Sequence, residues 1–179
     1  MTASLSPPPV RPGRPEQMST RLAFFIAGFG IAAWAPLVPY AKARAGLDEG
    51  TLGLLLLSLG VGSILAMPIA GALASRYGCR RVLTVGTLLV CLALPLLATA
   101  SSIPLLIATL FLFGAGLGTV DSTTNLQAVI VERASGKTMM SGFHGMFSLG
   151  GIIGAAGVSA LLGLGLSPLG ATLVVNALL

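Results

Sequence analysis

One carboxylate lies inside a long uncharged stretch of the sequence. No charged residue occurs between Arg81 and Asp121, and the next one after Asp121 is Glu132. At 1.5 Å per residue, a helix would place Asp121 about 17 Å from Glu132 and about 25 Å from Pro104. In an apolar layer about 30 Å thick, the acid would lie well inside. Because a buried acid of this kind costs about 2.5–3.5 kcal/mol, we expect it to face a polar cavity and to have a function.

The residues around Asp121 have helical spacing. Gly114, Gly118, Asp121 and Asn125 are separated by four, three and four positions and therefore share one helix face. Asn125 can donate a hydrogen bond to the acid. Since burial disfavours the charged form of a carboxylate, Asp121 is the candidate for a proton-coupling group. Asn125, Thr124 and Gly118 are candidates for a substrate cavity, and a purely structural acid bonded to Asn125 and to nearby hydroxyls is the alternative.

A second polar stripe follows in the next apolar segment. Ser141, His144, Ser148 and Gly151 recur at the same helical period. His144 and Ser148 are therefore further candidates for the cavity wall. The alternative for His144 is an interfacial position, with its ring bonded to a loop carbonyl or to Ser148.

Glycines are abundant, with 24 in the chain. The pairs Gly114/Gly118 and Gly150/Gly154 have the four-residue spacing that lets membrane helices approach closely, so we predict helix-packing notches rather than ligand contacts. The run from Gly114 to Gly118 is not read as a dinucleotide-binding loop, because no strand precedes it.

Composition indicates a helical membrane protein. Hydrophobic residues make up 55% of the chain and charged residues 8%, whereas a soluble domain carries about a quarter charged residues. Residues 1–19 are expected to form a disordered tail, and residues 20–179 a bundle of transmembrane helices. The predicted spans lie at about 20–40, 51–74, 82–100, 103–131 and 139–165. The last apolar run, 167–179, reaches only about 20 Å, so the sixth helix is expected to be incomplete.

The basic residues are distributed unevenly over the predicted connections. Eight of the ten lie on one side of the predicted membrane: Arg11, Arg14, Arg21, Arg76, Arg80, Arg81, Arg133 and Lys137. This positive-inside pattern predicts a cytoplasmic N-terminus and explains the net charge of +5 without nucleic acid as a partner. A cleaved signal peptide over the first run is the alternative. The single histidine and two separated cysteines indicate no metal site and no disulfide.

The connection between the second and third runs carries a recognisable pattern. Residues 71–81 resemble the loop signature of the major facilitator superfamily, G-x-x-x-D-R/K-x-G-R/K-x-R/K. The resemblance implies a gate loop formed by Gly71, Ser75, Arg76, Gly78 and Arg81. Ser75 replaces the usual acid, which in the family helps to latch the cytoplasmic gate, and Cys79 replaces a usual basic residue. An ordinary positive-inside loop with a turn glycine is the alternative.

A second resemblance is narrower. Residues 119–125 and 141–151 are similar to the fucose-permease-like branch of that superfamily, in which an acid of span four is followed four residues later by Asn. Asp121 and Asn125 fall on these positions. In sugar/proton symporters of this branch, the resemblance implies, the acid is a protonation site near the substrate cavity. A second acid used in span one has no counterpart in residues 32–36, so the same two-acid coupling is not expected.

The resemblance covers residues 20–179 and corresponds to one six-helix half of a usual twelve. It implies a proton-coupled secondary transporter of a sugar-like or other small organic solute, working by alternating access in the cell (inner or plasma) membrane. The expected partners are the solute, protons, the lipid bilayer and a missing C-terminal half. No nucleotide-binding loop is present, so transport is expected to be secondary rather than ATP-driven. No cofactor is expected, and no enzymatic activity is expected because no nucleophile is paired with a suitable base. The alternatives are a non-transporting membrane scaffold or sensor, and a half-size protein that transports as a dimer.

Overall fold

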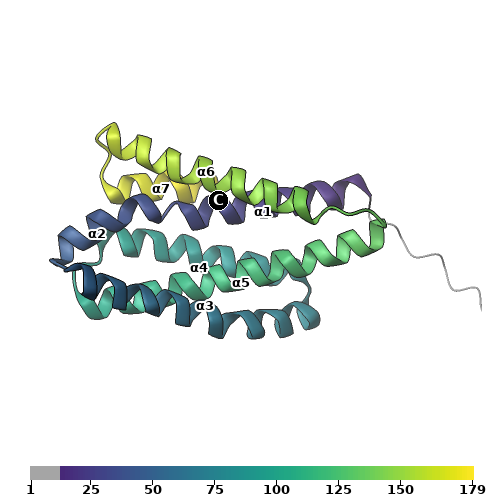
Figure 1. Ribbon diagram of the computed structural model, residues 1–179, viewed down its shortest axis with the longest axis horizontal. Helices are drawn as coiled ribbons and strands as arrows, with labels where there is room; N and C mark the ends of the chain where they lie inside the picture. Colours follow the sequence, from purple (N-terminus) through teal and green to yellow (C-terminus); the bar gives the residue numbers. More distant parts are fainter. Residues whose placement is uncertain (1–12) are drawn as a thin grey trace, which may run out of the picture.

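The computed structural model describes residues 13–179, and all regular structure in this range is helical (Figure 1). The elements are α1 (Arg14–Ala32), the 3-10 helix η1 (Ala35–Leu37), α2 (Val38–Ala45), α3 (Glu49–Tyr77), α4 (Cys79–Thr99), α5 (Ile103–Ser135), α6 (Met140–Gly163) and α7 (Pro168–Leu178). The run Arg14–Ala45 and helices α3, α4, α5 and α6 are long and apolar enough to cross a membrane, and α7 is a shorter apolar helix. The predicted all-α membrane class is confirmed.

The first helix begins earlier than the sequence predicts. The expected tail over residues 1–19 is too long, because α1 begins at Arg14. Pro15 lies in its first turn, where a missing N–H removes no intrahelical bond. The remainder of the expected tail, residues 1–12, lies outside the described residues.

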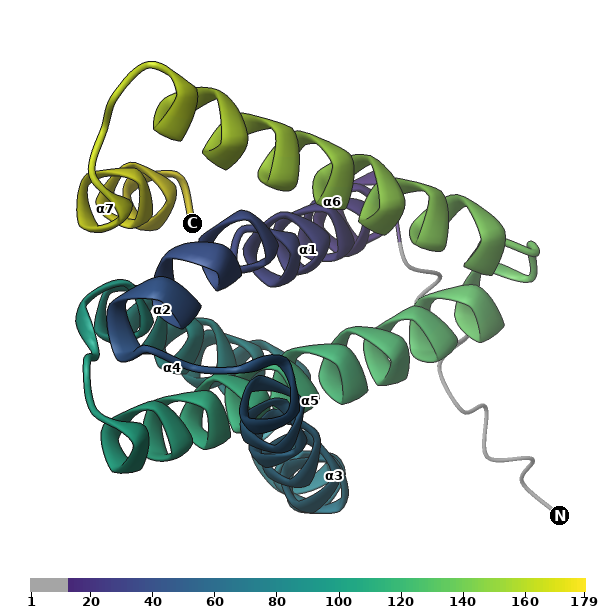
Figure 2. The same cartoon turned by 60° about the vertical axis from the view of Figure 1, so that its left-hand side comes forward.

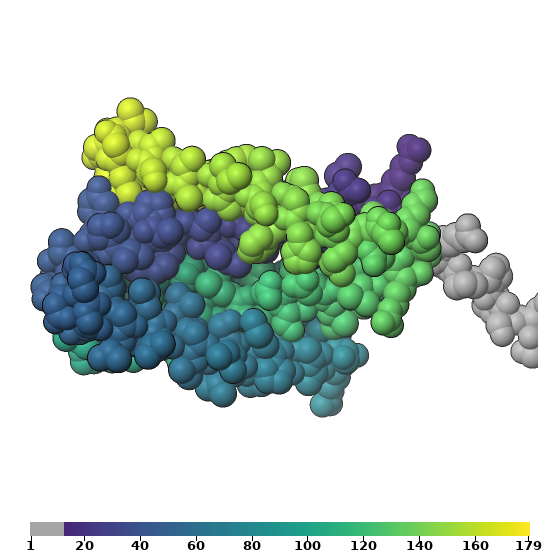
Figure 3. Space-filling model, viewed as in Figure 1, coloured from purple at the N-terminus to yellow at the C-terminus, as the bar shows by residue number. Residues whose placement is uncertain are grey.

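The bundle is built from two closely packed helix pairs. Helix α3 packs along α5, and α1 packs along α6, while α4 packs against α5 and α7 against α4 and α6. Figure 2 shows α5 and α6 close together at the turn that joins them and diverging from there. In the space-filling view, α5 lies between α6 and α3 (Figure 3).

Glycines allow both pairs to approach so closely. A Cβ atom on Gly114 or Gly118 of α5 would overlap the carbonyl oxygen of Leu59 or Ser63 of α3. The same holds between α1 and α6, where a Cβ atom on Gly150 would overlap the carbonyl oxygen of Phe25. Gly62 in the first pair and Gly28 and Gly154 in the second are equally close to the partner backbone. The prediction that these glycine pairs are packing notches is confirmed.

The first span is interrupted near Trp34. Pro36 and Pro39 lack the N–H groups that would continue the α-helical ladder, so η1 and α2 follow α1 as separate turns. The span therefore extends to Ala45, five residues beyond the predicted limit. The Trp34 ring is buried and packs edge-on against Phe113 of α5, with ring centroids 6.3 Å apart.

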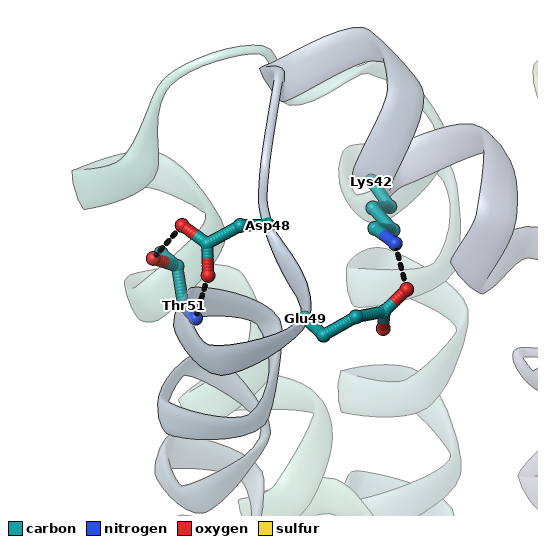
Figure 4. Close-up of polar contacts among 4 residues, drawn as sticks. All are labelled: Lys42, Asp48, Glu49 and Thr51. Atoms are coloured by element: carbon teal, nitrogen blue, oxygen red, sulfur yellow. Dashed lines mark hydrogen bonds and ion pairs between the residues drawn. The ribbon is translucent and has the colours of Figure 1, made fainter.

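The connection between α2 and α3 is fixed by local polar contacts (Figure 4). Asp48 caps α3, because its carboxylate accepts hydrogen bonds of 2.8 Å from both the backbone N–H and the hydroxyl of Thr51. The N–H of Thr51, together with its hydroxyl, lowers the pKa of Asp48 below its ordinary value. Lys42 and Glu49 form an ion pair beside it.

Arg44 joins this end of the first span to α4. Its Nε donates to the carbonyl of Ala100 at 2.8 Å, and its Nη2 donates to the carbonyl of Leu97 at 2.7 Å. A cation is favourable at a helix C-terminus, where the last carbonyls have no intrahelical partner. Arg44 therefore holds the broken first span against the end of α4.

Pro95 leaves one backbone carbonyl of α4 without its usual hydrogen-bond donor, and α7 supplies another donor. Helix α4 continues through Pro95, which cannot donate to the carbonyl of Cys91 four residues earlier. Asn176 of α7 supplies the missing donor, with its Nδ2 2.6 Å from that carbonyl oxygen. This bond links α7 to α4.

Replacing Asn176 by Leu is therefore expected to destabilise the protein by about 0.6–1.7 kcal/mol, from the average to the largest value measured for interhelical hydrogen bonds in membranes. In a Pro95→Ala background the new N–H can bond to Cys91, so the same substitution should cost less. Thermal unfolding of the four proteins of this cycle in detergent measures the coupling. An equal cost of Asn176→Leu in both backgrounds would contradict this assignment.

Candidate functional site

Asp121 lies in the middle of α5 and is half-buried. The Nδ2 of Asn125, one helical turn further on, lies 3.2 Å from Asp121 Oδ1 and 2.9 Å from the Asp121 carbonyl oxygen. The predicted hydrogen bond between the acid and Asn125 is therefore present. The Asn125 amide thus bonds to both the side chain and the backbone carbonyl of Asp121.

Thr124 faces a different environment from the carboxylate. Its buried hydroxyl donates within α5, to the carbonyls of Val120 at 2.8 Å and Asp121 at 3.0 Å. It lines a cavity of about 460 Å³ between α1, α4 and α5. Thr123 and Gln127 line the same cavity, and Asp121 does not. The structure therefore does not bring Thr124 and the Asp121 carboxylate into one cavity.

Gly118 lies between two packed helices. It is buried in the α3–α5 contact, where a Cβ atom would overlap the carbonyl oxygen of Ser63. The sequence-based assignment of Gly118 to a substrate cavity is corrected accordingly, because the face of α5 that carries the glycines packs against α3. Ser122, on the same side, donates to the Met67 carbonyl of α3 at 3.3 Å. Asp121 and Asn125 border this packed face and are themselves half-buried.

His144 and Ser148 lie on α6 and are both exposed. The His144 ring packs edge-on against Phe24 of α1, with centroids 5.4 Å apart. Within residues 13–179, no hydrogen bond joins His144 to a loop carbonyl or to Ser148, and none joins either residue to Asp121 or Asn125. The two polar stripes therefore lie on separate helices that diverge from their common turn (Figure 2).

Glu132 fixes that turn, a role that sequence reasoning missed. Its Oε2 accepts hydrogen bonds from the backbone N–H groups of Met139 at 2.6 Å and Met140 at 2.7 Å. An anion is favourable at a helix N-terminus, and the carboxylate thus anchors the start of α6 to the end of α5. Gly136 ends α5 with a φ of 66°, a conformation suited to glycine. Glu132 lies eight residues before Met140, the first residue of α6. This separation is too long for a local capping pattern, so the sequence does not indicate the contact.

The predicted gate loop forms the tight turn between α3 and α4. Gly78 has a φ of 87°, which an L-residue rarely adopts, and its N–H bonds to the carbonyl of Ala74 at 2.9 Å. The Ser75 hydroxyl donates to the carbonyl of Gly71 at 2.9 Å, within its own helix. Arg76 lies 5.2 Å from the centroid of the Tyr77 ring.

Within residues 13–179, the Ser75 side chain therefore makes no hydrogen bond to another helix. Arg81 is exposed at the start of α4, and a Cβ atom on Gly71 would meet nothing within 4 Å. The loop residues are brought together as predicted, and their side chains form no ion pair among the described residues. In the same part of the chain, no group of three or more His, Cys, Asp or Glu side chains could hold a metal ion.

Three relatives share much of this sequence. A protein of Yersinia pestis described as an uncharacterized MFS-type transporter is 55% identical over 179 residues, which are 100% of this chain and 47% of that protein. An uncharacterized transporter of Sinorhizobium fredii is 37% identical over 134 residues, covering 75% of this chain and 36% of its own. The 4-hydroxybenzoate transporter of Pseudomonas aeruginosa is 30% identical over 139 residues, covering 75% and 31%. The chain thus spans less than half the length of each of these relatives.

The family comparison agrees with the helical architecture. Residues 21–179, from the first span to the end of α7, match the family described as Major Facilitator Superfamily. The chain has the all-helical fold expected of the N-terminal half of such a protein, with five helical runs that could cross a membrane. It belongs to the major facilitator superfamily.

Proposed function

We propose that the protein containing this chain is a secondary active transporter of a small organic solute, coupled to proton movement through Asp121. The observation that carries the proposal is the position of this acid. It is the one charged side chain between Arg81 and Glu132, and it lies half-buried in the middle of the longest helix. A carboxylate in such a place is costly when ionised and is therefore suited to bind and release a proton during transport.

Protonation of Asp121 would act on its hydrogen bond to Asn125. With Asp121 ionised, the Asn125 amide donates to Oδ1. Protonation removes the charge and weakens this charge-assisted bond, which lowers the cost of placing the region in an apolar environment. The glycine-packed pairs α1–α6 and α3–α5 would move as units, and their movement against the remainder of the protein would expose the site alternately to the two sides.

The solute class is proposed from two sources. One relative is described as a 4-hydroxybenzoate transporter, and the fucose-permease-like resemblance of residues 119–125 and 141–151 implies a sugar. Both are small organic molecules with several polar groups. Asn125, Thr124, His144 and Ser148 remain candidates to bind such groups, each from its own position on α5 or α6.

A non-transporting scaffold or sensor is the second candidate. It is favoured by Ser75, whose hydroxyl bonds within its own helix, and by the absence of an acid in residues 32–36.

Uptake by the full-length protein in liposomes distinguishes these candidates. With an acidic exterior, we expect 4-hydroxybenzoate or a monosaccharide to accumulate above its external concentration, and collapse of the pH difference to release it. Solute added without a pH difference should in turn drive proton entry, measured with a trapped pH indicator. A scaffold or sensor predicts neither flux for any solute of a panel that covers both classes.

We further propose that the protein lies in the inner or plasma membrane with its N-terminus and its Arg-rich loops in the cytoplasm. Ser101 and Thr138 are exposed at opposite ends of α5 and suit a labelling test. In a background without Cys79 and Cys91, an impermeant thiol reagent added to intact cells should label Ser101→Cys and not Thr138→Cys. The reverse pattern would show the opposite orientation.

A further inference from the structure

An apolar groove opens between α3 and α4 next to the tight turn at Gly78. Its volume is about 420 Å³, within the range of ligand pockets. The walls are formed by Ile69 and Leu73 of α3 and by Val85 and Leu89 of α4, and the floor by Ala115 of α5. The groove exists because α3 packs closely along α5 and only loosely against α4, so α3 and α4 separate beyond the turn.

The groove has one basic end. Tyr77 and Arg81 line it beside the turn, and Arg76 lies over the Tyr77 ring. No acidic residue occurs between Glu49 and Asp121, and none of the arginines of this turn forms an ion pair within residues 13–179. The positive charge at this end of the groove is therefore available to an anion from outside the chain.

The length and the apolar lining of the groove indicate which kind of anion it suits. From Arg81 to Leu89 the groove extends about 12 Å along α4, and its lining is almost wholly apolar. Tyrosine is typical of the membrane interface, where phospholipid headgroups lie, and arginine binds phosphate through two parallel N–H groups. A free phosphate would fill the basic end alone and leave the apolar length empty.

We propose that this groove binds an anionic phospholipid, with the phosphate at Arg81 and an acyl chain along the walls between α3 and α4. This interaction goes beyond the proposed transport function and does not depend on it. Arg81 is the residue that selects the headgroup, while the apolar walls accept any acyl chain.

Quenching of tryptophan fluorescence by brominated lipids can test this proposal in the full-length protein. Val85 lines the groove and is 56% exposed, so a Val85→Trp variant reports on lipid in the groove. Leu92 is equally exposed on α4 and lies outside the groove, so Leu92→Trp is the matched reporter for bulk lipid. The native Trp34 is buried and contributes the same background to both.

Brominated phosphatidylglycerol, titrated into phosphatidylcholine bilayers, should half-quench the Val85→Trp reporter at a mole fraction about fivefold lower than brominated phosphatidylcholine requires. Leu92→Trp should show no such preference. Arg81→Gln should abolish the preference at position 85. Arg80→Gln removes the same charge one residue away, from a side chain that lines a different cavity, and should leave it largely intact.

Three results would overturn the proposal. Equal quenching by the two lipids at position 85 would show that the groove does not select anionic headgroups. Equal losses in Arg81→Gln and Arg80→Gln would show attraction by the surface charge of the turn in general. Absence of quenching at position 85, with normal quenching at position 92, would show that another part of the full-length protein covers the groove.

Discussion

Asp121→Asn is expected to abolish solute accumulation driven by a pH difference in the full-length protein. For one proton per solute, a difference of one pH unit can support about tenfold accumulation, because it is worth about 1.4 kcal/mol. The Asn side chain keeps the shape of the acid and can still accept a hydrogen bond from Asn125, but it cannot change its charge. The accumulation ratio should therefore fall to about one, while exchange of labelled solute between equal pools continues.

Glu132→Gln is the matched control for this substitution. It makes the same change of acid to amide on the same helix, at a side chain whose structural role is to accept the N–H groups at the start of α6. Both bonds end on one carboxylate oxygen, and an amide oxygen can still accept them without the charge, so coupling should survive even if the protein is less stable. Retained pH-driven accumulation in a well-expressed Asp121→Asn protein would remove this acid from the mechanism. Simultaneous loss of exchange and folding would assign it a structural role.

The second large effect is expected at the α3–α5 contact. In Gly114→Ala the added methyl group would overlap the backbone carbonyl of Leu59, which cannot move aside as a flexible side chain can. The two helices must separate, and overpacking of this kind costs about 3 kcal/mol at the upper end of its usual range. We expect a marked fall in the thermal midpoint of the full-length protein in detergent and a broadened size-exclusion peak.

Gly60→Ala provides the control on the partner helix. A Cβ atom at Gly60 of α3 would meet nothing within 4 Å, and alanine is the better helix former. This variant should be as stable as the parent protein or slightly more stable. If Gly60→Ala and Gly114→Ala had the same effect, close approach of the two helices would not be the reason for glycine at position 114.

Some features of this fold could be read directly from the sequence because their causes are local. The spans follow from uninterrupted apolar runs, and the break near Trp34 follows from Pro36 and Pro39. The bond between Asn125 and Asp121 follows from their separation by one helical turn. In each case the interacting groups are neighbours on one segment.

Other features depend on which segments meet, and the sequence contains no local sign of them. The sequence does not show whether a glycine such as Gly118 faces a cavity or packs against another helix. In the structure Gly118 packs against Ser63 of α3. Asn176 and Cys91, whose carbonyl accepts its hydrogen bond, are 85 residues apart. The separation of His144 from Asp121 depends on how α5 and α6 diverge, which helical periodicity does not describe.

The pairing of the helices has a consequence for biosynthesis. Among the described helices, α1 leaves the ribosome before the others, yet its glycine-packed partner α6 ends only at Gly163. At translation rates of about 5–20 residues per second, the first helix must wait on the order of ten seconds for that partner. Helices α3 and α5 can meet earlier, when residue Ser135 has been made. The α3–α5 pair is therefore available as a surface on which the bundle assembles, and α1 is inserted into the bilayer before this pair but completes its packing after it.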